Sequence, residues 1–418
     1  MRIEVFPLKT LYDEPLQIRV TEAPPAHSLT VKASALDGLK RRWSSEATFV
    51  SAGNGEVDLA CQAPRSGSYR TADANGLLWS MQLDRDIEQR SAFSVLHAGD
   101  VTIRLWVELD GVERVAAQVE RQFLTNQTIR EEVRDEGLVA SFFHPKEGAY
   151  PGIIVLGGSA GGLAEDLPPL LASHGYAVLS LGYFLLPGLP QELVGIPLEY
   201  FARAIAWLKR NPAVRDDLLA VSGASRGGEL ALLLGATFAD FKAVVAYVPS
   251  GVVWPGIGSS SGEPPNSAWT WRGKSVECMV TAAPDPALWS KSPVAITPWF
   301  LESMKNRQHL EAAAIAVENI NGPVLMFSGT DDQMWPSLNL ADLAVQRLAA
   351  RNFPHPYEHV SYAGAGHFIR FPYSPPISAI FHPVTRVLMA LGGTPEANHI
   401  ANLDSWRRCL SFLKKFLG

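Results

Sequence analysis

Apolar and polar residues alternate in short runs along the first 125 residues of the chain. The runs at 16–20, 28–33 and 101–107 have a period of two, and glycine, proline, asparagine and aspartate separate them. Period-two alternation with frequent turns is typical of antiparallel strands that bury one face. We therefore predict an all-β, immunoglobulin-like sandwich domain at 1–125, followed by a linking segment at 126–148.

The pattern changes after residue 150, where apolar strand-like runs alternate with longer helical patterns. In the pattern at 199–210, Phe201, Ile205 and Leu208 recur at the spacing of one helix face. Strands that alternate with helices predict a mostly parallel α/β sheet, and we assign 149–418 to this second domain. The strand candidates are 152–156, 177–181, 218–221, 243–248, 324–327 and 358–362.

An insertion at about 250–300 interrupts the α/β pattern. It is rich in glycine, serine and proline, and Trp254, Trp269, Trp271 and Trp289 are spread along it. An insertion of this length in a compact fold is often a lid or a binding loop. A surface excursion that its tryptophans pack down explains the pattern equally well, so both interpretations stay open.

Composition narrows the class of protein. With 418 residues and 47% hydrophobic residues, the chain can fill two domain cores, and its formal charge of −6 offers no basic field for nucleic acid. Three widely spaced cysteines fit neither a disulfide framework nor a metal cluster, which favours a reducing compartment. The first residues carry no signal-peptide pattern, and prolines break the most apolar stretch. We predict a cytoplasmic protein without stable membrane insertion.

The sequence Gly-Ala-Ser-Arg-Gly at 223–227 stands between a strand candidate and a helical pattern. A strand that turns into a helix on Gly-x-Ser-x-Gly holds its serine at a strained, exposed elbow, and bulkier residues than glycine would collide there. A serine hydroxyl is a poor nucleophile by itself, so a base and an orienting acid are expected further along. We predict that Ser225 is a nucleophile and not a turn serine that satisfies nearby backbone groups.

The acid is expected in the loop after a late strand. The strand candidate 324–327 leads into a loop with two adjacent carboxylates, Asp331 and Asp332. Related hydrolases usually place the acid three residues after the loop glycine, here Gly329, which selects Asp332. Asp331 better fits the role of a cap for the next helix.

The base is expected after the acid. His367 follows the strand candidate 358–362 in a Gly-Ala-Gly-His context, the only one of ten histidines placed in this way. His355 and His359 come before or within the strand, while His382 and His399 lie in later helical or loop regions. The order serine, acid, histidine is that of an α/β-hydrolase domain.

Acyl transfer also requires backbone donors for the oxyanion. One should be the N–H of Arg226, directly after the serine. The other should come from the glycine-rich loop 157–162, where we favour Ser159. This loop does not end in Lys-Ser or Lys-Thr, so it is not a phosphate-binding P-loop.

Together these residues resemble the acyl-CoA thioesterases grouped with bile acid-CoA:amino acid N-acyltransferase, over nearly the whole chain. Gly-x-Ser-x-Gly-Gly-Glu-Leu and Asp-Asp-x-x-Trp are far more specific than the serine motif alone. The segments that carry the resemblance are 75–81, 137–145, 161–163, 223–230, 317–323, 329–335 and 366–367.

The resemblance implies a β-sandwich followed by an α/β-hydrolase domain with Ser225, Asp332 and His367 as catalytic residues. It implies hydrolysis of acyl-CoA to a carboxylic acid and CoA through an acyl-serine, with no metal or redox cofactor. Members of the family that conjugate amino acids use cysteine as nucleophile, so a serine favours transfer to water.

Three alternatives remain at this point: a serine esterase or lactonase, an acyl-CoA:amino acid N-acyltransferase, and a binding protein with a vestigial hydrolase domain. CoA is polyanionic, so cations near the site could contact it, although each one is more simply explained as a solvated surface residue. The candidates are Lys209, Arg210, Arg226 and Arg370.

Overall fold

The computed structural model describes residues 1–84, 92–95, 99–258 and 267–418. The chain divides into two units. Unit 1 comprises Met1–Thr125 together with the segment Arg370–Ile377, and unit 2 comprises Asn126–Ile369 and Ser378–Gly418. Sequence pattern assigns all of 149–418 to one domain, whereas the segment Arg370–Ile377 belongs to unit 1.

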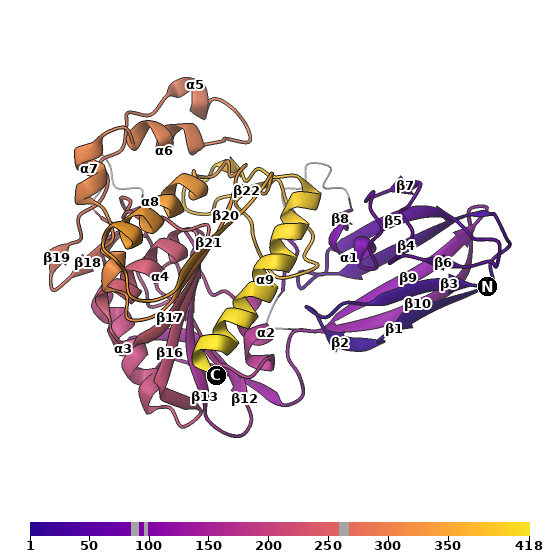
Figure 1. The fold of residues 1–418 in the computed structure, drawn as a ribbon, viewed down its shortest axis with the longest axis horizontal. Helices are drawn as coiled ribbons and strands as arrows, with labels where there is room; N and C mark the ends of the chain where they lie inside the picture. The colour runs from indigo at the N-terminus through magenta and orange to yellow at the C-terminus, as the bar shows by residue number, and fades with distance from the viewer. Residues whose placement is uncertain (85–91, 96–98, 259–266) are drawn as a thin grey trace. The chain divides into compact units, whose positions relative to one another are not determined.

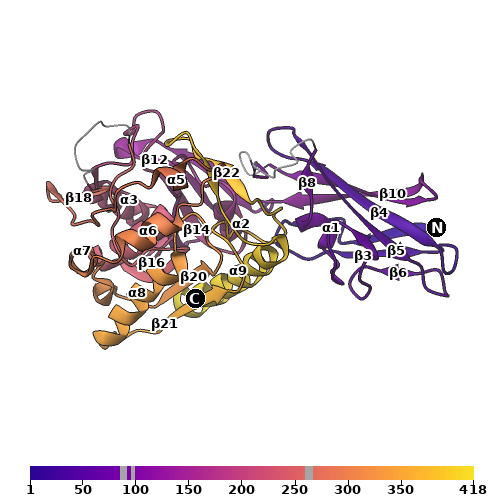
Figure 2. The ribbon, with the colours of Figure 1, turned by 90° about the horizontal axis from the view of Figure 1, so that it is seen from above.

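Unit 1 contains two β-sheets, seen as indigo and violet arrows in Figure 2. In β4, Leu29, Val31 and Ala33 are buried and alternate with more exposed residues, as a half-buried strand requires. The predicted N-terminal β-sandwich is confirmed. One sheet has the order β1 (Arg2–Phe6), β3 (Gln17–Thr21), β6 (Val57–Asp58). The other has the order β2 (Lys9–Leu11), β10 (Val112–Gln122), β9 (Val101–Leu109), β4 (Ser28–Leu36), β5 (Arg42–Val50), β7 (Ser66–Gly67), with β8 (Gln82–Leu83) also paired to β5; the short helix α1 is Gly76–Trp79.

The segment Arg370–Ile377 completes the core of unit 1. Phe371 is 0% exposed, and its ring meets those of Tyr12 and Phe123 edge-on, with centroids 5.3 Å away in each case. The buried guanidinium of Arg121 lies 5.5 Å from the ring of Tyr373. These contacts join residues more than two hundred positions apart, which is why no local pattern marks them.

Unit 2 is built on an eight-stranded sheet with the order β11-β12-β14-β13-β16-β17-β20-β21. Strand β12 is antiparallel to both of its neighbours, and the strands from β14 to β21 are parallel. The strands are β11 (Thr128–Val133), β12 (Val139–Pro145), β13 (Tyr150–Leu156), β14 (Ala177–Gly182), β16 (Val214–Ala224), β17 (Phe241–Tyr247), β20 (Val324–Gly329) and β21 (Tyr357–Tyr362).

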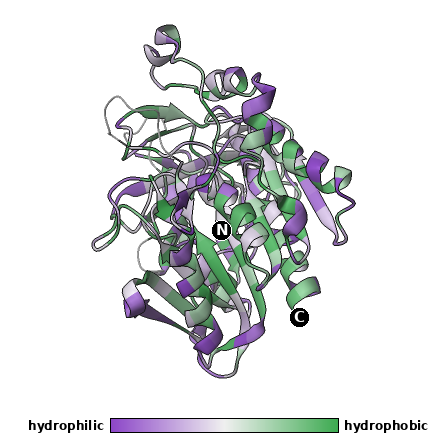
Figure 3. Cartoon of the chain, turned by 90° about the vertical axis from the view of Figure 1, so that its left-hand side faces the viewer, coloured by the Kyte–Doolittle hydropathy of each residue, from purple (hydrophilic) through white to green (hydrophobic). Residues whose placement is uncertain are grey.

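Helices cover both faces of this sheet: α3, α4 and α8 lie on one face, and α2 and α9 on the other (Figure 1). Inner strands such as β14 and β20 are therefore buried along their whole length, and green strands mark the hydrophobic centre of the sheet in Figure 3. Within the described ranges, no helix is both long and apolar enough to cross a bilayer. The helices are α2 (Leu167–Ser173), α3 (Leu198–Arg210), α4 (Arg226–Thr237), α8 (Ser337–Ala350) and α9 (Pro395–Leu417), with the 3₁₀ turns η1 (Asp135–Gly137) and η2 (Val317–Asn319). The predicted α/β-hydrolase fold class is confirmed.

The stretch expected to link the two domains, 126–148, instead supplies the first two strands of the unit 2 sheet. In β12, six consecutive residues from Val139 to His144 are buried. A strand covered on both faces lacks the period-two signal that marks a half-buried strand. Other strands of this sheet also lack that signal and are predicted from apolar runs within the strand–helix alternation, but β12 stands before that alternation begins.

The described residues of the inserted region form short elements. They are β18 (Trp269–Trp271), β19 (Lys274–Ser275), α5 (Pro286–Trp289) and α6 (Thr297–Ser303), with α7 (Arg307–Ala312) just beyond; β18 pairs with β15 (Ile196–Pro197). A final hairpin, β22 (Ala379–Phe381) and β23 (Leu388–Ala390), precedes α9 and is bridged to Val294 of the insertion. Residues 259–266 of the insertion lie outside the described residues.

Candidate active site

Ser225 occupies the sharp turn between β16 and α4 with a φ of +59°. Side chains rarely adopt this conformation, and such residues cluster at functional sites. The flanking glycines are required by close approach: a Cβ on Gly223 would lie 2.1 Å from the carbonyl oxygen of Gly227, and one on Gly227 would lie 2.4 Å from that of Gly157. The turn therefore has the geometry of a nucleophile elbow.

The structure brings together the three side chains that the sequence predicts to act together. The Nε2 atom of His367 is 2.9 Å from the Oγ of Ser225, and its Nδ1 is 2.9 Å from Oδ2 of Asp332. A carboxylate only accepts hydrogen bonds, so Nδ1 carries the ring proton and Nε2 accepts from the serine hydroxyl. Asp332 and His367 are 6% and 7% exposed.

Backbone contacts fix the acid and the base. The Oδ1 of Asp332 accepts hydrogen bonds from the N–H groups of Met334 and Trp335, at 3.0 and 3.2 Å. The N–H of His367 donates to the carbonyl oxygen of Leu391 at 2.8 Å. The indole of Trp335 packs edge-on against the imidazole, 6.0 Å between centroids. These contacts fix the position of the Asp332 carboxylate relative to the His367 ring.

Asp331 has a role other than the helix cap expected from the sequence. Its Oδ2 accepts from the N–H of Gly393 at 2.9 Å, and its Oδ1 accepts from the side chain of Gln333 at 3.2 Å. Helix α8 begins only at Ser337, with no side-chain cap. Asp331 therefore fastens the acid loop to the segment that follows β23.

Two backbone N–H groups are available beside Ser225. Within the described ranges, neither the N–H of Arg226 nor that of Ser159 donates to a protein acceptor. A Cβ on Gly158 would lie 3.2 Å from the Cβ of Ser225, so the loop after β13 borders the serine closely. The hydroxyl of buried Tyr183 donates to the carbonyl oxygen of Gly157 at 2.6 Å and holds this loop. The arrangement can receive a developing negative oxygen.

His382, set aside on sequence grounds, lies in this site. Its Nε2 is 2.9 Å from the Oγ of Ser159. Burial lowers the pKa of His382 to about 4, so the ring is neutral at physiological pH. It stands at the end of β22, and no motif in the sequence distinguishes it.

The guanidinium of Arg226 is buried and does not belong to a solvated surface. It lies 3.0 Å from the carboxylate of Glu229, which is 0% exposed. The same carboxylate accepts from the indole N–H of Trp269 at 2.7 Å and from the backbone N–H of Trp254 at 3.3 Å. These two tryptophans therefore pack the insertion onto α4, as one of the two interpretations of the insertion expected.

The insertion also meets the acid loop. The hydroxyl of Thr297 donates to the carbonyl oxygen of Asp332 at 2.7 Å.

The other cations considered for CoA binding have protein partners. Lys209 pairs with Asp240, Arg210 pairs with Glu136, and Arg370 donates to the carbonyl oxygen of Phe93.

A second serine, histidine and aspartate lie in a row away from the elbow. The Oγ of Ser328 is 2.7 Å from the Nε2 of His359, and the Nδ1 of His359 is 3.0 Å from the Oδ1 of Asp342. Ser328 lies within β20 and is 0% exposed, so a substrate carbonyl cannot reach it. This row is a structural hydrogen-bond chain between β20, β21 and α8.

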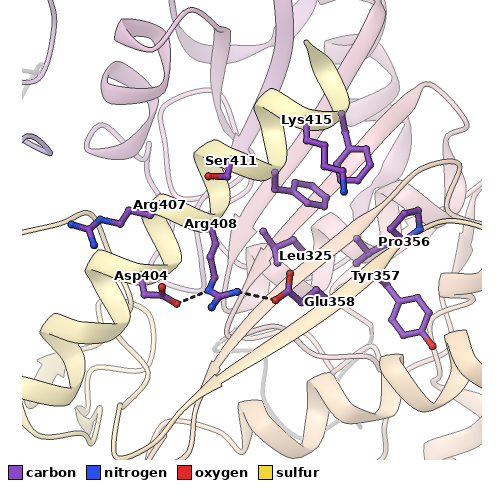
Figure 4. Close-up of a pocket in the computed structure, with 12 residues that line it drawn as sticks. Leu325, Pro356, Tyr357, Glu358, Asp404, Arg407, Arg408, Ser411 and Lys415 are labelled. Carbon is purple, nitrogen blue, oxygen red and sulfur yellow. Dashed lines mark hydrogen bonds and ion pairs between the residues drawn. The ribbon is translucent and has the colours of Figure 1, made fainter.

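A pocket of about 460 Å³ opens at the other end of the sheet (Figure 4). It is lined by the first residues of β20 and β21, such as Val324 and Tyr357, and by the last turns of α9. Arg408 bridges Asp404 and Glu358 there, at 2.6 and 2.9 Å. Ser225, Asp332 and His367 instead follow the carboxyl ends of β16, β20 and β21, where ligands bind in open α/β sheets. The pocket lies at the amino ends of β20 and β21 and is therefore separate from the candidate active site.

Comparison with known proteins fits this geometry. Residues 13–135 match the family model "Acyl-CoA thioester hydrolase/BAAT N-terminal region", and residues 196–418 match "BAAT / Acyl-CoA thioester hydrolase C terminal". Acyl-coenzyme A thioesterase 6 of Mus musculus is 33% identical over 98% of this chain and 95% of its own length. The mitochondrial acyl-coenzyme A thioesterase 2 of the same species is 30% identical over 98% and 88%. Acyl-coenzyme A amino acid N-acyltransferase 1, also of Mus musculus, is 30% identical over 98% and 96%. These matches confirm the resemblance seen in the sequence, and the chain belongs to the acyl-CoA thioester hydrolase/BAAT family.

Proposed function

We propose that the protein hydrolyses acyl-CoA thioesters to carboxylic acids and CoA, with Ser225 as the nucleophile. The observation that carries the proposal is the contact of 2.9 Å between the Oγ of Ser225, on its positive-φ elbow, and the Nε2 of His367. The names of the thioesterase relatives supply the substrate class.

In the first half of the reaction, Ser225 attacks the thioester carbonyl while His367 takes its proton. Asp332 stabilises the imidazolium that forms. The N–H groups of Ser159 and Arg226 receive the negative charge on the acyl oxygen. The intermediate then collapses to an acyl-serine, and His367 returns the proton to the departing sulfur, so that CoA leaves as a thiol.

In the second half, His367 takes a proton from a water molecule, which attacks the acyl-serine carbonyl. Collapse of this second intermediate returns the proton to the Oγ of Ser225 and releases the carboxylic acid. An acyl-cysteine would remain a thioester and stay reactive toward amines, whereas the oxygen ester on Ser225 is less reactive toward amines and is resolved by activated water. The serine therefore favours hydrolysis over amino acid conjugation.

The test compares three acceptor and substrate combinations. Purified protein is assayed for thiol release from a long-chain acyl-CoA, for acyl-glycine formation when glycine is added, and for hydrolysis of a short aryl ester. We expect thiol release without acyl-glycine, and a fall of roughly 10⁴-fold or more in turnover for Ser225→Ala with folding retained. Efficient ester cleavage with no thiol release would replace the proposal with a serine esterase. Unchanged turnover in Ser225→Ala would remove the nucleophile.

The compartment stays a prediction. The sequence favours the cytoplasm, whereas relatives are named as mitochondrial and as peroxisomal. Fractionation of cells that express the full chain decides between them.

A further inference from the structure

The contacts of His382 define which of its ring nitrogens carries the proton. The backbone N–H of Thr385 points to Nδ1 of His382 at 3.2 Å. A backbone N–H can only donate, so Nδ1 must be the unprotonated nitrogen of the neutral ring. The proton therefore lies on Nε2, which faces the Oγ of Ser159 at 2.9 Å.

This tautomer determines what the Ser159 hydroxyl can do. Because Nε2–H of His382 donates to the hydroxyl oxygen, the hydroxyl proton of Ser159 cannot be directed at the ring. Within the parts of the chain that the structure describes, this hydroxyl has no other protein partner. Its proton is left to be donated elsewhere.

The Ser159 hydroxyl lies on the loop that borders the nucleophile. The adjacent residue, Gly158, is so close that its Cβ would lie 3.2 Å from the Cβ and 3.7 Å from the Oγ of Ser225. Among the described residues, the backbone N–H of Ser159 has no acceptor. Because the Ser159 hydroxyl is carried by the same residue as this N–H, we expect it to lie within reach of the same acyl oxygen.

The ring is held in place by the hairpin that also holds the catalytic base. The N–H of His382 donates to the carbonyl oxygen of Val387, and the N–H of Arg386 donates to that of His382, both at 2.9 Å. The residue after β23, Leu391, accepts the hydrogen bond from the backbone of His367. One hairpin thus positions both histidines.

We propose that the Ser159 hydroxyl donates a third hydrogen bond to the acyl oxygen of the tetrahedral intermediate, and that His382 is the positioning residue that directs it there. This inference rests on the proposed function, because it assigns a further donor to the same acyl transfer. The neutral state of the ring supports this role. Because burial keeps the imidazole uncharged at physiological pH, Nε2 stays the donor and Nδ1 the acceptor.

The test is a double-mutant cycle on the full chain. Ser159→Ala keeps the backbone donor and removes the hydroxyl, and we expect kcat for acyl-CoA to fall roughly 10²-fold, with KM changed less than about threefold. His382→Ala is expected to lower kcat roughly tenfold in the wild-type background and less than about twofold in Ser159→Ala, because it acts through that hydroxyl. His382→Gln, which places an amide N–H near the position of Nε2, should restore part of the loss.

A matched control is the pair formed by Ser328 and His359. Ser328→Ala removes a hydrogen bond of 2.7 Å to His359 and should lower the melting temperature while kcat stays within about twofold of wild type. If His382→Ala does not fold, Ser159→Ala and His382→Gln still complete the comparison.

A second readout separates this inference from the proposed substrate. A fluorophosphonate phosphonylates the activated serine with loss of fluoride, and its phosphoryl oxygen occupies the oxyanion site whatever the natural substrate is. We expect slower labelling of Ser225 in Ser159→Ala and His382→Ala, measured by intact-protein mass. Normal labelling and normal kcat in Ser159→Ala, or equal additive losses in the double mutant, would overturn the role of the hydroxyl. Absence of thiol release by a wild-type protein that still labels would overturn only the substrate class.

Discussion

The two adjacent aspartates of the loop after β20, Asp331 and Asp332, have different hydrogen-bond partners, and we expect different effects when each is substituted. Asp332 turns both oxygens toward Nδ1 of His367, whereas Asp331 accepts from the backbone of Gly393. We expect Asp332→Asn to lower kcat roughly 10³- to 10⁴-fold, because an amide nitrogen facing Nδ1 favours the wrong imidazole tautomer. The measurement is steady-state thiol release.

Asp331→Asn is the matched control, because its amide oxygen can still accept from Gly393. Its kcat should stay within a few-fold of wild type. If the two variants lose activity equally, the acid has been assigned to the wrong member of the pair.

At this scale the sequence predicted which motif residues lie together, Ser225, Asp332 and His367, and missed His382, which belongs to no motif. Ser225 stands in the turn that follows an apolar strand pattern, and Asp332 stands in the loop that follows another. The hydrogen bond between Ser159 and His382 joins residues 223 positions apart. The glycine-rich loop marks Ser159, but its contact with His382 depends on where β22 ends in space, and no local pattern marks His382 as its partner.

Helix α4 carries a buried acidic group at the base of the elbow. Burial raises the pKa of Glu229 to about 7, against the opposing attraction of Arg226 and the hydrogen bond from Trp269. Burial raises the pKa of nearby Tyr183 and of Cys278, so both side chains stay uncharged near neutrality. The first turn of the helix that begins at Arg226 therefore contains a carboxyl group whose pKa lies near neutrality.

This shift predicts a pH dependence of stability. Between the ordinary pKa of 4.5 and the raised value near 7, the folded state binds the proton that the unfolded state releases. The free energy of unfolding therefore falls as pH rises through this window, by about 3 kcal/mol from this group. Glu229→Gln, which cannot titrate, should lack this part of the slope when urea unfolding is compared at pH 5 and pH 8. Parallel pH profiles for the two proteins would contradict the assignment.

Elements were predictable where their burial is one-sided or their strand–helix alternation is regular. The half-buried strand β4 shows its period of two in the sequence, and α3 shows its apolar face. Strand β12 is an apolar run that is buried on both faces and lies outside the regular alternation, so the sequence pattern alone places it in the link. The insertion has no period at all, because its order comes from single anchors such as Trp269 on Glu229.

Unit 1 is discontinuous in sequence, because it consists of Met1–Thr125 and the distant segment Arg370–Ile377. Only Phe368 and Ile369 separate this segment from His367. The sequence could not reveal this, because hydrophobic residues such as Phe371 and Ile377 fit the core of either unit equally well. Which core receives them is decided by contacts with residues near the N-terminus.

Phe371→Ala tests this organisation in the full chain. Removing a ring that is 0% exposed and packed on Tyr12 and Phe123 should cost about 3–5 kcal/mol of unfolding free energy. Because the segment begins just after His367, kcat should also fall several-fold as the chain beside the base loosens. Phe6→Ala, at a residue of unit 1 that is 70% exposed, should change stability by no more than about 0.5 kcal/mol. Urea unfolding and thiol release measure the two effects. A Phe371→Ala protein as stable as Phe6→Ala would mean that the segment does not belong to the core of unit 1.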